Sequence, residues 1–180
     1  FKLSDIDKDF YKKNKEILDN KVISPWLAKA YFVKKVLDQS NDEDTILWLD
    51  SDIKNILEDG IKNLFNLCNN SKKGIVGFHS DFWLEKTFTK KDLFNYLDIK
   101  DIRYEETNQS YGCLFILRKN KFTKYFFNRF LEICCKKNLM DYSLSKTKES
   151  SAFIIHQNDQ SILSLLLKLH NIKTFPLPLY

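Results

Sequence analysis

The sequence predicts an α/β fold in which helices cover a central, largely parallel sheet. Short apolar runs rich in β-branched and aromatic residues alternate along the chain with longer segments whose apolar residues recur at helical spacing. The apolar runs are bounded by charged or turn-forming residues, as expected for strands buried on both faces. Such alternation is typical of folds built around one sheet. The 180 residues suit one compact domain, residues 1–180.

The predicted elements begin with two helices and a strand. Residues 5–18 carry apolar side chains at helical spacing, and a second helix is expected over residues 24–39, with Ser24 as N-cap and Pro25 as the first helical residue. Residues 45–49, Thr-Ile-Leu-Trp-Leu, predict a buried strand. The other expected elements are strands at residues 74–78, 113–117, 153–155 and 173–175, and helices at residues 53–68, 89–97, 120–136 and 158–170.

Polar residues just before three of these helices are expected to cap them. Thr89 and Asp92 have the spacing of a capping box, in which each side chain bonds the other's backbone. Asn120 is the expected cap of the helix that follows it, and Asn158 or Asp159 that of the last long helix. These residues set the expected helix starts.

The charge pattern is that of a solvated surface. The net charge is +5, the basic residues are nearly all lysines, and acidic residues are interspersed with them along the chain. We therefore expect no nucleic-acid partner. No apolar run approaches the roughly 18 residues that a membrane-spanning helix needs, so we expect no transmembrane segment in this chain.

Cysteine and histidine usage argues against disulfides and against zinc. The four cysteines form no C-x-x-C pair, and two of them, Cys134 and Cys135, are adjacent. The three histidines are scattered, so a Cys/His zinc site is not expected. These observations favour a reducing compartment, and we expect a cytoplasmic protein, either free or at the periphery of a membrane.

A pair of carboxylates follows the first predicted strand. Asp50 and Asp52 come directly after its apolar run, and ligands of α/β sheets bind beyond the carboxyl ends of strands. Hard cations such as Mg²⁺ and Mn²⁺ take carboxylate oxygens together with substrate phosphates. With only four glycines, the segment offers no glycine-rich phosphate loop. We therefore expect Asp50 and Asp52 to hold Mn²⁺ or Mg²⁺ that neutralises a diphosphate; alternatively, one caps the next helix and the other is solvated.

The segment that leads to this pair resembles a known enzyme family. Residues 24–52, SPWLAKAYFVKKVLDQSNDEDTILWLDSD, are similar to glycosyltransferases of capsule and glycan synthesis with a GT-A-like fold and a DxD motif. Members carry a Trp-x-x-Lys-Pro-Tyr helix start before the strand that ends in the metal motif. Trp26, Lys29 and Tyr31 match this pattern, and Ala30 stands where the family has Pro.

Three further segments resemble the family in the same order along the chain. They are EKTFTKKDLF at residues 85–94, NQSYGCLFILRKN at residues 108–120 and HQNDQSILSLL at residues 156–166. The last resembles the family's His-Arg-x-Asp-Gln-Ser motif, and Gln157 stands where the family has Arg. The resemblance covers most of residues 24–175.

The resemblance implies a sugar-transfer reaction. The donor would be a UDP- or GDP-sugar, the acceptor a hydroxyl of a glycan or another molecule, and the cofactor Mn²⁺ or Mg²⁺. It also implies a Rossmann-like sheet with a further N-terminal strand that holds the nucleotide base, and we expect this strand to precede Phe1. Departure of a nucleoside diphosphate builds up negative charge, which a metal ion and a lysine stabilise.

Five residues outside the metal pair are candidates for the site. Asp159 is the expected catalytic residue, accepting the acceptor's proton or bonding a sugar hydroxyl, unless it is only a helix cap. Lys29 is expected to reach a phosphate, or else to be a solvated helix lysine. Trp26 is expected at the donor as core, wall or stacking platform, and Gln160 as partner of a sugar hydroxyl. His156 is expected on the metal or a diphosphate oxygen, or as a hydrogen-bonded structural residue.

Two other functions fit parts of the sequence. An apolar strand that ends in DxD also opens haloacid-dehalogenase-like phosphatases, in which Asp50 would be the nucleophile and Ser80, after the second strand, the hydroxyl residue. Against this, no small β-branched residue and Gly follow the motif, and no later strand ends in an acidic pair. A non-catalytic sugar- or nucleotide-binding module is the third interpretation, and the retained Asp50, Asp52 and Asp159 argue against it.

Overall fold

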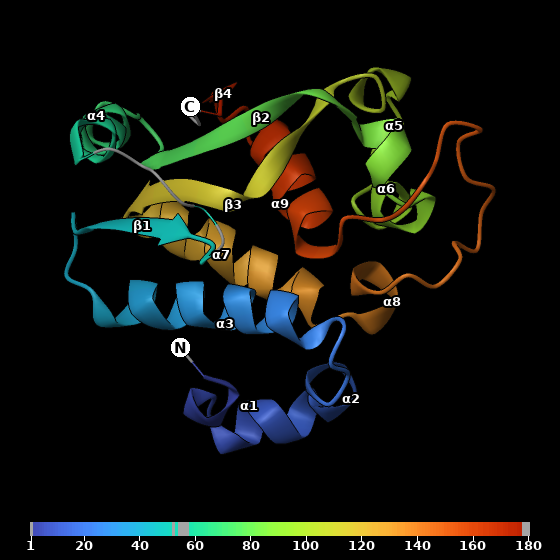
Figure 1. Cartoon of the computed structure of the whole chain (residues 1–180), viewed down its shortest axis with the longest axis horizontal. Coiled ribbons are helices and arrows are strands. Elements are labelled where there is room, and N and C mark those ends of the chain that lie inside the picture. The colour runs from blue at the N-terminus through green and yellow to red at the C-terminus, as the bar shows by residue number, and fades with distance from the viewer. Residues whose placement is uncertain (1, 52, 54–57, 178–180) are drawn as a thin grey trace.

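The computed structural model describes residues 2–51, 53 and 58–177. They form an α/β fold whose mixed sheet has helices on both faces (Figure 1). The strands are β1 (Thr45–Leu49), β2 (Ile75–Leu84), β3 (Asn108–Arg118) and β4 (Thr174–Pro176), in the order β1-β3-β2-β4. No strand forms at residues 153–155, where the Ile154 amide instead donates to the carbonyl oxygen of Thr87 at 2.9 Å.

The prediction of a largely parallel sheet is wrong. Strand β3 is antiparallel to both β1 and β2, and only β2 and β4 pair in parallel. Strands β1 and β2 therefore run in the same direction, as a strand–helix–strand unit leads one to expect. They are not neighbours, because β3 lies between them. Alternation of strands and helices along the sequence indicates the crossover, but it does not reveal which strand is inserted into it.

Alternate residues of β3 face the two helical layers. Phe115 and Leu117 lie in the larger core with α3 (Ser24–Gln39), α7 (Lys121–Cys134) and α9 (Asn158–Leu169). Leu114 and Ile116 point to the opposite face, where α4 (Glu58–Asn69) packs. This is the alternation of a strand buried on both sides. Among the described helices, none is long and apolar enough to cross a membrane.

The expected helix over residues 5–18 is divided into two. Helix α1 spans Lys8–Lys13 and ends at Asn14, whose side chain donates to the carbonyl oxygen of Phe10 at 2.9 Å. Asn competes with the helical backbone in this way, which makes it a natural point of division. The remaining short elements are η1 (Leu3–Asp5), α2 (Lys15–Leu18), α5 (Glu85–Phe88), α6 (Lys91–Tyr96), η2 (Ile102–Tyr104) and α8 (Lys137–Met140).

The expected helix caps were only partly correct. Asn120 caps α7, since its side-chain oxygen accepts from the Thr123 amide at 2.9 Å. Ser24 is the first residue of α3 and makes no capping bond. Thr89 and Asp92 form no capping box, because the Thr89 hydroxyl bonds the buried Glu85 carboxylate.

The start of α9 also differs from the prediction. Asn158 and Asp159 are the first two residues of α9, and no side chain caps it. Asn158 has a φ of 46°, in the left-handed region that Asn tolerates better than most residues. Its side-chain amide bonds the carbonyl oxygen of Met140, which fixes this turn of the backbone. Asp159 is therefore directed by a strained turn into the interior rather than along the helix end.

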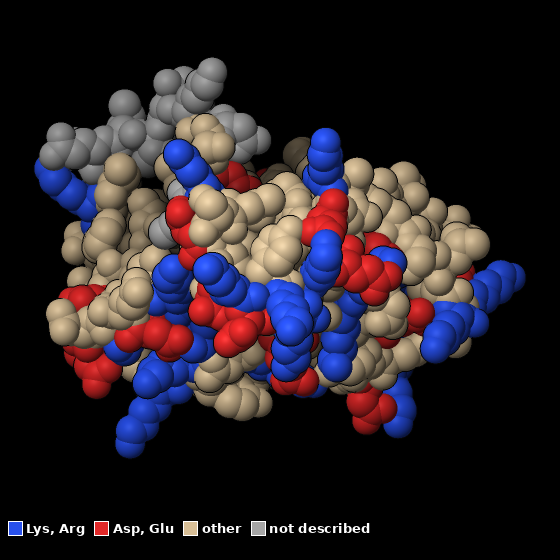
Figure 2. Space-filling view, turned by 90° about the horizontal axis from the view of Figure 1, so that it is seen from below, with Lys and Arg blue, Asp and Glu red and all other residues tan. Residues whose placement is uncertain are grey.

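The face that carries the N-terminal helices is covered by charges of both signs. Figure 2 shows lysines and acidic residues side by side there, as the sequence indicates for a solvated surface. Some of them form ion pairs, such as Lys15 with Asp19 and Lys137 with Glu16. Such exposed pairs contribute little to stability.

Candidate functional site

Three segments that are far apart in the sequence meet at the end of β1. Asp50 follows β1, Lys29 lies in the second turn of α3, and Asp159 lies in the first turn of α9. The Lys29 Nζ lies 3.0 Å from Oδ2 of Asp50 and 3.1 Å from Oδ2 of Asp159. The structure therefore brings together three of the residues that the sequence nominates.

The Lys29 ammonium group is held by a third contact, to the backbone of β3. Its Nζ donates to the carbonyl oxygen of Gly112 at 3.2 Å, and its side chain is only 10% exposed. Within the described part of the chain, no hydrogen bond of good geometry reaches Oδ2 of Asp159. Its polar contact is the ion pair with Lys29. Lys29 is thus a partly buried cation between two carboxylates, which excludes the interpretation as a solvated helix lysine.

One lysine shared by two carboxylates explains the titration of this cluster. Burial alone would lower the pKa of Lys29, but attraction to Asp159 and Asp50 outweighs it, and the pKa is raised. Asp159 is in the opposite position. Burial raises the pKa of its carboxyl, Lys29 opposes this without overcoming it, and the charge of Asp50 adds to the rise.

Asp50 faces the solvent side of this cluster. Its side chain is 29% exposed, whereas that of Asp159 is 3% exposed. The second oxygen, Oδ1, accepts from the indole Nε1 of Trp48 at 2.7 Å, and the Asp50 amide donates to the carbonyl oxygen of Cys113 at 2.9 Å. Asp50 is therefore the carboxylate of this cluster that a cation from the solvent can reach.

The second residue of the expected metal pair, Asp52, lies outside the described residues. Within the described ranges no group of three or more His, Cys, Asp or Glu side chains is placed to hold a metal ion. What the structure provides at this position is one partly exposed carboxylate, Asp50, with oxygen atoms of the kind that Mg²⁺ and Mn²⁺ bind. The metal pair therefore stays a prediction.

A cleft of about 550 Å³ opens beside Asp50. This volume is within the roughly 300–1,000 Å³ of small-molecule sites. One wall is the first part of α3, and the opposite wall is the end of β1. The cleft is lined by Lys2, Leu3, Ser24, Pro25, Trp26, Ala28, Lys29, Phe32, Trp48, Leu49, Asp50 and Ser51. It combines aromatic surface with one cationic and one anionic group of the cluster.

Trp26 is part of the wall of this cleft. Its ring packs edge-to-face against Tyr142, with ring centroids 6.0 Å apart. This position fits the expected wall, and a stacking role toward a nucleotide or sugar stays a prediction. Trp48, predicted only as a strand residue, has a more specific role, since its indole orients Asp50.

Gln160 has hydrogen-bond partners within the protein. Its Oε1 accepts from the Gly112 amide at 2.9 Å, and its Nε2 donates to Oε1 of Gln109 at 2.7 Å. The expected bond to a sugar hydroxyl would have to use the second lone pair of Oε1 or the second N–H of Nε2. Gly112 and Gln109 were not among the residues nominated from the sequence, although both lie in the nominated segment 108–120.

His156 belongs to the structural framework rather than to the cleft. It is 2% exposed, its Nδ1 accepts from the Lys90 amide at 3.3 Å, and its Nε2 lies 2.9 Å from the Leu139 carbonyl oxygen. Burial lowers the pKa of His156 to about 4, so the ring is neutral at physiological pH. Because both ring nitrogens are engaged with the backbone, we remove His156 from the candidates for binding metal or diphosphate.

Comparison with known proteins adds no identification. No family model matches the chain, and it has no significant match among curated proteins or solved structures. The function must therefore be argued from the site itself.

The raised pKa of Asp159 makes a prediction about stability and pH. Its carboxyl releases the proton near 3.8 in the unfolded chain and at higher pH in the folded protein. The folded state is therefore disfavoured as pH rises through the folded pKa. We therefore expect the melting temperature of Asp159→Asn, measured relative to wild type, to rise as the pH increases from about 4 to 7. Each kcal/mol of difference in the free energy of unfolding corresponds to about 2–4 °C.

Differential scanning calorimetry of both proteins at each pH measures this difference. Asp42→Asn, at a side chain that is 84% exposed, controls for the loss of one carboxylate. A melting-temperature difference that shrinks with rising pH would mean that attraction to Lys29 dominates and that the pKa is lowered.

Proposed function

We propose that this chain is a metal-dependent glycosyltransferase, which moves a sugar from a nucleoside-diphosphate donor to a hydroxyl acceptor. The observation that carries the proposal is the convergence of Asp50, Lys29 and Asp159 in one cluster, of which Asp50 and Lys29 line a cleft beyond the carboxyl end of β1. Ligands of α/β sheets bind at such an edge. Asp50 and Asp52 are the proposed ligands of Mn²⁺ or Mg²⁺, in line with the resemblance of residues 24–52 to glycosyltransferases.

The reaction requires two things of these residues. The bond between the anomeric carbon and the diphosphate oxygen breaks, and the diphosphate leaves with the electron pair. A bond forms between that carbon and the acceptor oxygen, whose proton is released. The site must therefore neutralise a growing negative charge at one point and accept a proton at another.

Lys29 is the residue that we propose binds the diphosphate. Its ammonium group lines the cleft and is charged at neutral pH, because two carboxylates raise its pKa. A fixed cation of this kind stabilises charge that develops on a leaving group. Bound at Asp50 and Asp52, the metal ion would add its own positive charge to the same phosphates.

Asp159 has two possible roles that experiment distinguishes. The raised pKa makes the Asp159 carboxylate a stronger base than an exposed aspartate, as suits a general base. Its side chain, however, is 3% exposed and is paired with Lys29, so in the described geometry it holds that ammonium group in place. We propose proton acceptance as its catalytic role, and orientation of Lys29 as the alternative.

The phosphatase interpretation has less support. Ser80, the hydroxyl that it requires, is 1% exposed, and its Oγ accepts from the amides of Phe82 and Trp83, both at 3.1 Å. This hydroxyl bonds the backbone of β2 where its register with β3 shifts, and it does not line the cleft beside Asp50. A phosphatase would hydrolyse phosphate esters with Mg²⁺, whereas a glycosyltransferase slowly hydrolyses nucleotide sugars with Mn²⁺, so the two screens separate these classes. A non-catalytic binding module would do neither.

Ligand binding should stabilise the folded protein. At a free concentration roughly 100 times the dissociation constant, Mn²⁺ with UDP or GDP should add about 2.7 kcal/mol. At this chain length the melting temperature then rises by about 5–10 °C. The measurement is a thermal-shift series with each nucleotide, with and without Mn²⁺, and with UMP or GMP as controls that lack the second phosphate. If no diphosphate changes the melting temperature under any metal condition, the donor site does not exist.

Substitution of the metal pair should remove this stabilisation. In Asp50→Asn or Asp52→Asn a metal ligand is lost, and with it the charge that holds the diphosphate. We expect isothermal titration calorimetry to detect no metal-dependent binding of UDP or GDP, and turnover to be abolished. Asp44→Asn, another aspartate near β1, is the matched control and should bind like wild type. Undiminished binding by both variants of the pair would exclude them as ligands.

The two roles of Asp159 differ in what Asp159→Asn changes. If Asp159 accepts the proton, binding of Mn²⁺ and the diphosphate stays near the wild-type level, and transfer falls by roughly a hundred- to ten-thousandfold. If it only orients Lys29, diphosphate affinity falls together with transfer. Parallel measurements of UDP or GDP affinity and of single-turnover transfer decide between the two. Full activity with unchanged affinity would remove Asp159 from the site.

A further inference from the structure

We propose that Gln160 is a positioning residue, which together with Gln109 clamps the backbone of Gly112 and so fixes the place of the Lys29 ammonium group. The link from Lys29 to a donor phosphate rests on the proposed function, whereas the clamp itself does not. Gln160 would then serve the site from inside the protein rather than as a partner of the sugar.

Gly112 connects Gln160 to Lys29 through one residue of β3. Its amide donates to Oε1 of Gln160 at 2.9 Å, and its carbonyl oxygen accepts from Nζ of Lys29 at 3.2 Å. The amide and the carbonyl of Gly112 belong to different peptide planes, which are joined through its φ and ψ angles. Because Gly112 lies in strand β3, these angles are held in the extended range, so holding the amide restrains the carbonyl. The position of the Lys29 ammonium therefore depends on the Gln160 amide.

The Gln160 amide is itself held in one orientation. Its Nε2 donates to Oε1 of Gln109 at 2.7 Å, and Gln109 is fully buried. The Nε2 of Gln109 lies 3.0 Å from the hydroxyl of Thr89 and 3.1 Å from that of Ser161. The buried Gln109 amide therefore has one favoured orientation. If it were flipped, its Nε2 would face Nε2 of Gln160, and both are donors.

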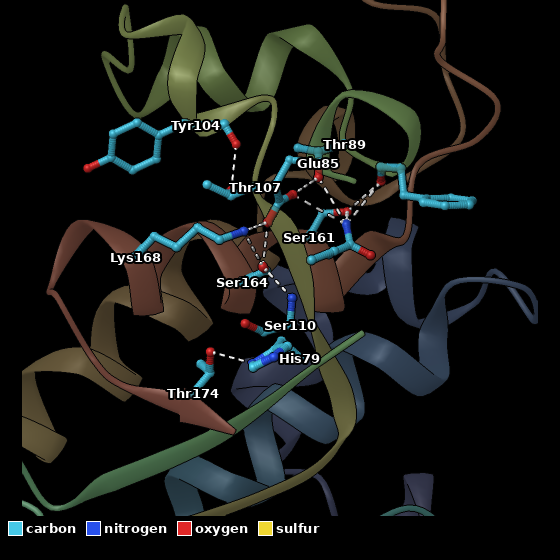
Figure 3. A network of polar contacts seen from close by, with 12 residues as sticks. His79, Glu85, Thr89, Tyr104, Thr107, Ser110, Ser161, Ser164, Lys168 and Thr174 are labelled. Atoms are coloured by element: carbon cyan, nitrogen blue, oxygen red, sulfur yellow. Dashed lines mark hydrogen bonds and ion pairs between the residues drawn. The ribbon is translucent and has the colours of Figure 1, made fainter. Parts of the chain in front are cut away.

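The Gln109 side chain is connected to a buried network around Glu85. Figure 3 shows Glu85 between Thr89, Ser164 and Lys168, and these three side chains all bond its carboxylate. Glu85 is fully buried, and Lys168 lies on α9, as Gln160 does. The network also reaches β3, since the Ser110 amide donates to Oγ of Ser164 at 2.7 Å and Nε2 of Gln109 lies 3.1 Å from Oγ of Ser161, and it thereby holds α9 against β3.

Residue 112 is suited to this contact because it is glycine. A Cβ there would lie 3.1 Å from Cβ of Gln160 and 3.3 Å from its Cα, closer than ordinary van der Waals contact. It would also lie 3.5 Å from Oδ2 of Asp159. The start of α9 thus reaches the β3 backbone only where no side chain intervenes, and this approach places Asp159 beside Lys29.

The clamp is tested first in the ligand-free protein. Gln160→Met keeps the size of the side chain and removes both bonds, so the Gly112 amide should exchange with solvent at least about tenfold faster. Gln157→Met is the matched control on the preceding turn, since its side-chain amide has no hydrogen-bond partner among the described residues. A double-mutant cycle with Lys29→Met, measured by urea unfolding, should give coupling of about fivefold or more in the unfolding constant.

The second measurement is the affinity for Mn²⁺ with UDP or GDP. Gln160→Met should weaken it by about five- to fiftyfold, and Gln157→Met should not change it. Equal amide exchange in the two variants, or an additive double-mutant cycle, would overturn the clamp. If Lys29→Met does not fold, amide exchange and affinity in the single variants decide the outcome. A wild-type protein that binds neither nucleotide refutes the proposed function, while amide exchange still tests the clamp.

Discussion

The ammonium group of Lys29 is the point on which the site depends. It joins helix α3, the end of β1, the backbone of β3 and the first turn of α9 through contacts of 3.0–3.2 Å. A buried charge is tolerated only when it is paired, and removing one partner of a buried pair typically costs about 3–5 kcal/mol. Each of these segments must therefore be in place before the cleft acquires its charge distribution.

The antiparallel insertion of β3 is what makes this cluster possible. Because β3 runs opposite to β1, Leu49 pairs with Leu114, and the Asp50 amide bonds the carbonyl oxygen of Cys113. Gly112, the next residue toward the start of β3, then lies at the same edge as Asp50. In the parallel arrangement that the sequence predicts, the start of this strand would lie at the opposite edge of the sheet. The departure from the expected topology is thus also the origin of the site.

Buried polar groups on α9 give the helix a defined place on the sheet. An apolar helix face tolerates small shifts, whereas hydrogen bonds do not, because each broken one leaves a buried group unsatisfied. The contacts of Glu85, Gln109 and Gln160 are of this kind. They extend from Glu85 to the Gly112 amide of β3, which links the packing of α9 to the position of Asp159.

The sequence by itself determined the features that depend on neighbouring residues. The apolar run of β1, the Asn120 cap and the position of Asp50 beyond a strand follow from local spacing, and Lys29 and Asp159 were nominated by motif resemblance. Strand order, the retention of His156 by two backbone groups and the pairing of Gln160 with Gly112 were decided by tertiary structure alone. The hydrogen-bond partners of His156 and Gln160 named here lie 17 to 66 residues away, and a local pattern does not specify which distant group will satisfy a buried donor or acceptor.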